Sequence, residues 1–129
     1  LIKNLKQPFL GICLGMQLLC SHSKEGNTDC MGIFKEKIKR FPAGNKIPHI
    51  GWNNILNLKG PLFNNVPECS DVYFVHSYYA ESGNETIAST DYALNFSAAL
   101  QKNNFYGVQF HPEKSAETGE LILRNFLSL

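Results

Sequence analysis

One cysteine stands between two glycines in the stretch Gly11 to Gly15, which reads Gly-Ile-Cys-Leu-Gly. An apolar run precedes it and apolar residues at helical spacing follow, so we expect a buried strand, a tight turn and a helix. This G-x-C-x-G pattern is the thiol counterpart of the nucleophile elbow, a sharp turn that exposes a reactive side chain. We expect a helix that begins at Leu14 to lower the pKa of the Cys13 thiol through its dipole. The Leu14 amide is also placed to donate to an oxyanion.

A thiol nucleophile needs a base, and the base needs an acceptor that orients it. His111, Pro112 and Glu113 directly follow a second apolar run, residues 105–110, that we expect to be a buried strand. Pro112 favours an extended conformation at His111, so the ring and the Glu113 carboxylate can approach each other. The carboxyl ends of parallel strands share one edge of a sheet. We therefore predict that Cys13, His111 and Glu113 meet there, although a core cysteine and a surface loop explain each motif taken alone.

The sequence predicts that the elements which position these residues form one α/β domain. The apolar and β-branched patterns predict strands over residues 8–13, 32–41, 47–58, 71–80, 85–93, 96–104 and 105–110. Helices are expected over residues 14–22 and from Ser115 onward, with Ser115 as the N-cap. Residues 60–66 predict a short helix or a turn.

Composition and length exclude several classes of protein. The chain has 129 residues, 43% hydrophobic and 18% charged, which is typical of one globular domain. A net charge of +1 indicates no nucleic-acid partner, and no apolar run is long enough to span a membrane. The four cysteines form no C-x-x-C pair, which argues against zinc. We expect reduced thiols, a cytoplasmic location, and no metal or other cofactor.

The first strand begins close to the start of the chain, and a parallel strand buries both faces only between neighbours. We therefore expect residues 1–129 to be the C-terminal part of a single longer domain, truncated at its N-terminus.

Taken together, the motifs GICLGMQ and GVQFHPEKS resemble those of the class I (triad) glutamine amidotransferases. The resemblance implies a flavodoxin-like fold with a mixed, mainly parallel sheet flanked by helices. It also implies that Cys13 is the nucleophile, His111 the acid/base and Glu113 its orienter. The residues expected to bind glutamine are Leu14, Gly15, Gln17, His76, Ser77 and Tyr78. Without the resemblance, Gln17 reads as an exposed helix residue and Ser77 as a strand residue that faces water.

The segment IPHIGWNNI is similar to the P-H-x-G-W-N signature of the glutaminase subunits of imidazole glycerol phosphate synthase, in histidine biosynthesis. That likeness implies glutamine hydrolysis and delivery of ammonia to a (βα)8-barrel cyclase subunit in a heterodimer, without a cofactor. The residues expected towards the cyclase are His49, Trp52, Asn53, Tyr73 and Lys114. On residue type alone, Trp52 is explained equally well as a core aromatic. Lys114 is then explained as a charge exposed to solvent.

Three alternatives remain open at this point. The chain could be the amidotransferase subunit of another ammonia-using synthase, a truncated fragment that acts only as a binding module, or a cysteine hydrolase of similar architecture. The family carries a glycine-containing loop of the oxyanion site before the elbow, and these residues hold no counterpart. A single oxyanion donor is worth roughly a hundredfold to a thousandfold in rate, so we expect little glutaminase activity from these 129 residues alone.

Overall fold

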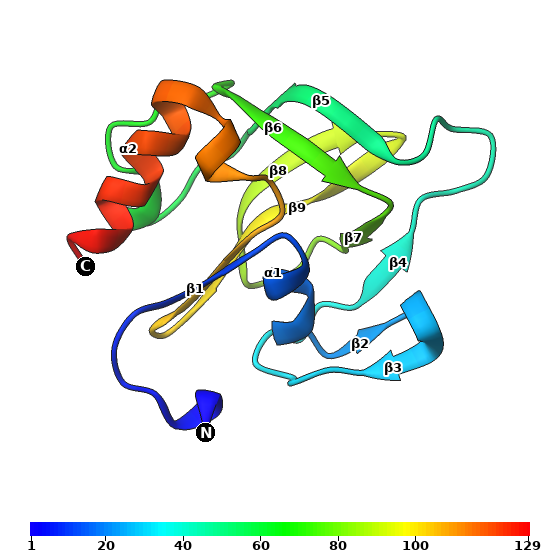
Figure 1. The fold of residues 1–129 in the computed structure, drawn as a ribbon, viewed down its shortest axis with the longest axis horizontal. Helices are drawn as coiled ribbons and strands as arrows, with labels where there is room; N and C mark the ends of the chain where they lie inside the picture. The colour runs from blue at the N-terminus through cyan, green and yellow to red at the C-terminus, as the bar shows by residue number, and fades with distance from the viewer.

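A curled, mixed sheet runs through the computed structural model, which describes residues 1–129 (Figure 1). The strands are β1 (Phe9–Ile12), β2 (His22–Ser23), β3 (Thr28–Asp29), β4 (Ile38–Arg40), β5 (His49–Asn54), β6 (Asp71–His76), β7 (Tyr78–Ala80), β8 (Thr86–Tyr92), β9 (Leu94–Lys102) and β10 (Phe105–Val108). The α-helices are α1 (Leu14–Leu19) and α2 (Ala116–Leu127), and 3-10 turns cover Ile2–Asn4, Glu25–Asn27, Pro61–Phe63 and Pro112–Lys114.

The strand order in the main sheet is β1-β10-β9-β7-β4-β2-β3, with β8 paired to β9. Strands β5 and β6 form a separate antiparallel ribbon, which crosses over the curled sheet in Figure 1. The α/β class is confirmed, because helices flank a mixed sheet.

The expectation of a mainly parallel sheet is wrong for these residues. Only the pairings of β1 with β10 and of β2 with β4 are parallel. The connection from β8 to β9 is Ala93 alone, and that from β9 to β10 is Asn103 and Asn104. Connections this short join only antiparallel neighbours, which is why the centre of the sheet is antiparallel.

Three predicted elements differ from the structure. The strand predicted over residues 71–80 breaks at Ser77, so β6 and β7 belong to different sheets. In the strand predicted over residues 32–41, the amides of Lys35 and Lys37 donate to Glu85 and Glu81 carboxylates instead of a neighbouring strand. Only β4 therefore forms there. The predicted helix over 14–22 ends at Leu19, because the chain turns to an extended conformation at the next residue.

Two apolar clusters hold the elements together. The larger lies between the β5–β6 ribbon, β8, β9 and α2 and includes Phe74, Phe96 and Phe110. The smaller lies beneath α1 and includes Met16 and Phe34. Strand β1 is an edge strand, since β10 is its single neighbour. Neither α-helix has the length and apolar character that a bilayer-spanning helix requires.

Candidate functional site

The elbow places Cys13 in a strained backbone conformation between β1 and α1. Its φ is 54° and its ψ is −108°, a region that residues with a Cβ avoid. A Cβ on Gly11 would lie 2.8 Å from backbone atoms of Gly15, so only glycine allows the strand and the helix to approach this closely. A Cβ on Gly15 would meet nothing within 4 Å. Packing therefore requires glycine at Gly11, whereas Gly15 borders open space.

The environment raises the pKa of the Cys13 thiol instead of lowering it as the sequence predicted. Burial is the largest cause, and it exceeds the opposing effects of the Leu14 amide and the Gln109 side chain. Helix α1 has only six residues, so its dipole is a small counterweight to desolvation. Gln109 Nε2 donates to the sulfur at 3.6 Å.

One edge of β6 anchors both Cys13 and His111. The Cys13 thiol donates to the Val75 carbonyl at 3.7 Å, and the His111 amide donates to the Tyr73 carbonyl at 3.0 Å. Two residues along a strand span about 7 Å, and their carbonyls point to the same side. The two predicted reactive residues therefore leave adjacent strands and attach to the same edge, two residues apart.

The His111 ring is oriented by the predicted carboxylate. Nδ1 of His111 lies 2.8 Å from Oε2 of Glu113, which leaves Nε2 without a protein partner. No hydrogen bond joins the imidazole to the Cys13 sulfur, whose partners are Val75 and Gln109. The structure brings His111 and Glu113 together and places Cys13 beside them with its thiol turned to β6.

Ser115, at the N-terminus of α2, and Gly119, within α2, support the His111 turn. Ser115 is the N-cap residue of α2, as predicted, but its side chain makes no capping hydrogen bond. Its Oγ instead donates to the His111 carbonyl at 2.6 Å and accepts from the Tyr73 amide at 3.0 Å. A Cβ on Gly119 would lie 1.9 Å from the Pro112 carbonyl oxygen, so α2 packs directly against the turn at that position.

A cleft of about 180 Å³ opens beside the thiol. Its walls are formed by Cys13, Leu14, Gln17, Glu25, Val75, His76, Ser77 and Tyr78. All of the residues predicted to bind substrate except Gly15 belong to these walls, although they come from α1 and from the break between β6 and β7. The cleft is therefore the place where a ligand can lie next to the sulfur.

Gln17 is buried, not exposed as its helix pattern suggested. Its Nε2 donates to the Tyr78 carbonyl at 3.1 Å and to Gln109 Oε1 at 2.9 Å. No protein group donates to its own carbonyl oxygen, which remains available at the cleft.

The His76 side chain does not offer a nitrogen to a ligand. Nδ1 lies 2.7 Å from the Tyr78 carbonyl and Nε2 lies 2.9 Å from His49 Nδ1. Both ring nitrogens are thus engaged within the protein, and the predicted role of His76 in glutamine binding is that of a residue in the cleft wall. The residue supports the cleft wall from behind.

The residues expected at a partner surface divide into two groups. Trp52 is 55% exposed and packs edge-on against Tyr73, with ring centroids 5.8 Å apart. Lys114, three residues after His111, is exposed. Asn53 is half-buried, and its Nδ2 donates to the Asp91 carbonyl at 3.0 Å.

His49 does not reach the surface. It is 4% exposed and its ring stacks on Tyr92 and Phe74, with centroids 4.0 and 4.9 Å away. Successive side chains of a strand point to opposite faces, so His49 and Trp52 cannot both face outward from β5. The prediction that His49 faces a partner is wrong for this reason.

Two residues of the site were missed in the sequence. Gln109 is fully buried beside the sulfur, and a polar side chain inside the apolar run of residues 105–110 was the available signal. Glu25 lies in the polar hairpin that follows α1, where no pattern distinguishes it from a solvated charge.

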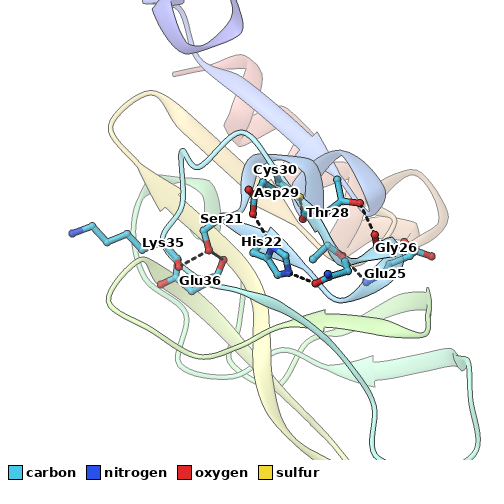
Figure 2. A network of polar contacts seen from close by, with 11 residues as sticks. Ser21, His22, Glu25, Gly26, Thr28, Asp29, Cys30, Lys35 and Glu36 are labelled. Carbon is cyan, nitrogen blue, oxygen red and sulfur yellow. Dashed lines mark hydrogen bonds and ion pairs between the residues drawn. The ribbon is translucent and has the colours of Figure 1, made fainter.

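The hairpin that carries Glu25 is closed by its own side chains, as Figure 2 shows. His22 bonds to Asp29 at 2.8 Å and to Asn27 at 3.1 Å, and the Glu25 amide donates to Ser23 Oγ at 3.1 Å. These contacts hold the Glu25 backbone at the mouth of the cleft. No group of three or more His, Cys, Asp and Glu side chains is arranged to hold a metal ion.

The chain is similar in sequence to a described protein family and to several known proteins that share one name. The family model described as "Glutamine amidotransferase class-I" matches residues 1–129. The imidazole glycerol phosphate synthase subunit HisH of Bacteroides fragilis is 57% identical over 131 residues, covering 99% of this chain and 67% of the relative. The subunit of the same name from Buchnera aphidicola is 50% identical, covering 99% of this chain and 67% of the relative.

The fold has relatives among solved structures. A glutamine amidotransferase from Thermotoga maritima superposes with a TM-score of 0.62 at 21% identity, covering 94% of this chain and 47% of that one. The chain thus spans about two thirds of the length of the curated relatives and about half of this solved chain.

Proposed function

Because the chain belongs to the class I glutamine amidotransferase family, we propose that it is the glutaminase part of an imidazole glycerol phosphate synthase. The single observation that carries this proposal is the attachment of Cys13, which lines the cleft, and of His111, which is paired with Glu113, to the same edge of β6. Residues 1–129 form the C-terminal part of one amidotransferase domain in this proposal, and the four free cysteines suit a reducing compartment such as the cytoplasm.

Glutamine binds in the cleft through complementary charges. The unpartnered Gln17 carbonyl oxygen and the Glu25 carboxylate accept hydrogen bonds from the α-ammonium group. The backbone at Ser77 and Tyr78 borders the α-carboxylate. The cleft volume next to the sulfur leaves room for the carboxamide.

Catalysis then follows from the positions of three side chains. His111 Nε2 takes the thiol proton, and the Cys13 sulfur attacks the carboxamide carbon, while the Leu14 amide stabilises the oxyanion. His111 returns the proton to the departing ammonia, which leaves a γ-glutamyl thioester. It then activates water, which releases glutamate and restores the thiol. Glu113 holds the ring throughout through Nδ1.

The raised pKa of the thiol gives this sequence of steps a physical consequence. Since burial disfavours the thiolate, the sulfur is protonated until His111 accepts its proton in the occupied cleft. The thiol must also leave the Val75 carbonyl to reach the substrate. Substrate binding and nucleophile activation are therefore linked.

Ammonia is transferred to a (βα)8-barrel cyclase subunit in this proposal. The exposed Trp52, packed on Tyr73, supplies the large aromatic surface that interfaces favour. Lys114 adds a charged group to that surface, whereas Asn53, the residue after Trp52 in β5, points to the opposite face. Direct transfer matters because ammonia is protonated in bulk water and then no longer reacts as a nucleophile.

The function is tested with a diazoketone analogue of L-glutamine, which alkylates a thiol only after its amino-acid group is bound. Intact mass spectrometry of the purified chain is expected to show one adduct, located on Cys13 by peptide mapping. L-Glutamine is expected to slow the labelling, and Cys13→Ser to abolish it.

The matched control is Cys30→Ser, because Cys30 is a half-buried free cysteine outside the proposed chemistry. That variant is expected to be labelled like the unaltered chain. Labelling that ignores glutamine, or that occurs equally at the other cysteines, would contradict the proposal. Co-purification with a different synthase would replace the cyclase as the partner and leave the glutaminase assignment intact.

A further inference from the structure

Polar side chains, of which His49 and His76 are buried, form a continuous row behind the cleft. Asn53 Nδ2 lies 3.4 Å from His49 Nε2, and His49 Nδ1 lies 2.9 Å from His76 Nε2. His76 Nδ1 lies 2.7 Å from the Tyr78 carbonyl, which also accepts from Gln17 at 3.1 Å. The row therefore runs from the ribbon strand β5 to the cleft.

The direction of every hydrogen bond in the row is determined by its last acceptor. The Tyr78 carbonyl only accepts, so His76 Nδ1 carries a proton. Burial lowers the pKa of both His76 and His49 to about 4; at His76 it exceeds the opposing effect of the Tyr78 carbonyl, and His49 and His111 lower the pKa further. Both rings are therefore neutral near pH 7. A neutral His76 accepts at Nε2, so His49 donates from Nδ1 and accepts from Asn53 at Nε2.

Ring packing fixes the same arrangement. The His49 ring stacks on Tyr92 with centroids 4.0 Å apart, and the His76 ring lies 5.2 Å from both Phe41 and Phe96. Neither ring can rotate without displacing these aromatic side chains, so each histidine is held in one orientation.

The row determines which end of the Gln17 amide faces the ligand. The Tyr78 carbonyl receives one hydrogen bond from His76 and one from Gln17, and Gln17 Nε2 gives its second to Gln109 at 2.9 Å. With its nitrogen held by two acceptors, Gln17 must present its oxygen to the cleft. Loss of the His76 bond frees the Tyr78 carbonyl to move with the chain break at Ser77.

We propose that His76 and His49 are positioning residues, which hold the Tyr78 carbonyl and, through it, the orientation of the Gln17 amide that binds the substrate ammonium group. The inference rests on the proposed glutaminase function. The alternative role for the pair is space filling between the ribbon and β9, and that role needs no particular tautomer.

The tautomers are tested directly by long-range ¹H–¹⁵N correlation spectra of the purified chain. Both histidines are expected to be neutral and protonated at Nδ1 from about pH 5.5 to about pH 8. A proton at Nε2 of His76, or a charged ring above about pH 6, would overturn the proposal.

Two substitutions then separate positioning from space filling. His76→Phe keeps an aromatic ring but removes the donor to Tyr78, whereas His76→Asn keeps a donor near the Nδ1 position but leaves a cavity. The readout is the glutamine concentration that half-protects Cys13 from the diazoketone, with the melting temperature measured in parallel. His76→Phe is expected to raise that concentration about tenfold, the effect of one buried hydrogen bond, and His76→Asn to raise it less than about threefold despite a lower melting temperature.

The opposite order, in which His76→Phe is protected like the unaltered chain and His76→Asn loses protection with its stability, would overturn the proposal. Its failure is distinguishable from that of the proposed function. If glutamine fails to protect the unaltered chain, the glutaminase assignment and the substrate part of this inference both fall. If glutamine protects but the tautomers or the order of the variants are wrong, only the positioning role is excluded.

Discussion

At the scale of single residues, Cys13 combines a strained backbone conformation with a thiol that its surroundings keep protonated. Its backbone has a positive φ of 54°, and burial raises the pKa of its thiol. A residue held in such a conformation costs of order 1–3 kcal/mol and persists because the surrounding structure imposes it. Gly11 imposes it here by allowing α1 to pack against β1.

This strain predicts an unusual order of stabilities. Cys13→Gly is expected to be more stable than Cys13→Ala by about 1 kcal/mol, because glycine adopts a positive φ without steric cost. Urea denaturation followed by circular dichroism measures the difference. At Cys30, which lacks a positive φ, the order is expected to reverse, since alanine restricts the unfolded chain more than glycine does. Equal stability of the two Cys13 variants would show that the elbow is unstrained.

At the scale of secondary-structure elements, helix α2 acts as a support for the His111 turn. Gly119 faces the Pro112 carbonyl with no room for a Cβ, and Ser115 joins the turn to β6. The helix is amphipathic and buries Ile122 against the larger apolar cluster. Its position is therefore fixed by the core, and the turn is fixed by the helix.

Gly119→Ala is expected to displace this turn. Overpacking at a backbone contact costs about 1–3 kcal/mol, so the free energy of unfolding is expected to fall by about 2 kcal/mol. Labelling of Cys13 by the diazoketone is expected to slow, because His111 and Glu113 move with Pro112. Urea denaturation and labelling rates measure both effects. Thr118→Ala, one position earlier in α2, is expected to change neither by much; equal effects at the two positions would contradict a specific role for Gly119.

The element scale also shows what local pattern predicts well and what it misses. The strands now numbered β1, β8, β9 and β10 were predicted because apolar and β-branched runs end at clear turn residues. The break at Ser77 was missed, since the run from Asp71 to Ala80 contains no glycine or proline. Only the pairing of its two halves with different sheets, a non-local effect, separates β6 from β7.

At the scale of the whole molecule, a buried carboxyl group joins two distant segments. Glu36 is 4% exposed, its Oε2 accepts from the Glu85 amide at 3.2 Å, and no donor reaches its Oε1. Burial and the neighbouring Glu85 carboxylate raise the pKa of Glu36. The folded chain therefore binds this proton more tightly than the unfolded chain does. The associated stability is present at low pH and is lost as the pH rises through the folded-state pKa.

Glu36→Gln is expected to stabilise the chain above that pH by about 1 kcal/mol, because its amide supplies permanently the hydrogen that the carboxyl loses. The measured quantity is the difference in unfolding free energy between variant and unaltered chain at pH values from about 5 to about 8. That difference is expected to grow with pH. Taking the difference removes the contribution of His49 and His76, whose lowered pKa values act in the opposite direction. The exposed Glu117→Gln serves as control, and a difference independent of pH would contradict the assignment.

The assembled site is the part that sequence predicts least directly. The motifs around Cys13 and His111 identified the reactive residues, because their spacing reflects local chain geometry. The cleft combines α1, the Glu25 hairpin and the Ser77 break, and no local pattern encodes that meeting. Whether His49 lies inside or outside depended on the alternation of β5, which the signature alone did not resolve.

The attachment of Cys13 and His111 to carbonyls of Val75 and Tyr73 has a consequence for tolerance to error. Successive carbonyls of a strand face opposite edges, so a slip of β6 by one residue would remove both attachments at once. The two-residue spacing of carbonyls along β6 thus sets the separation of the sulfur and the imidazole. Misalignment of that strand would abolish the arrangement of Cys13 and His111 completely instead of weakening it gradually.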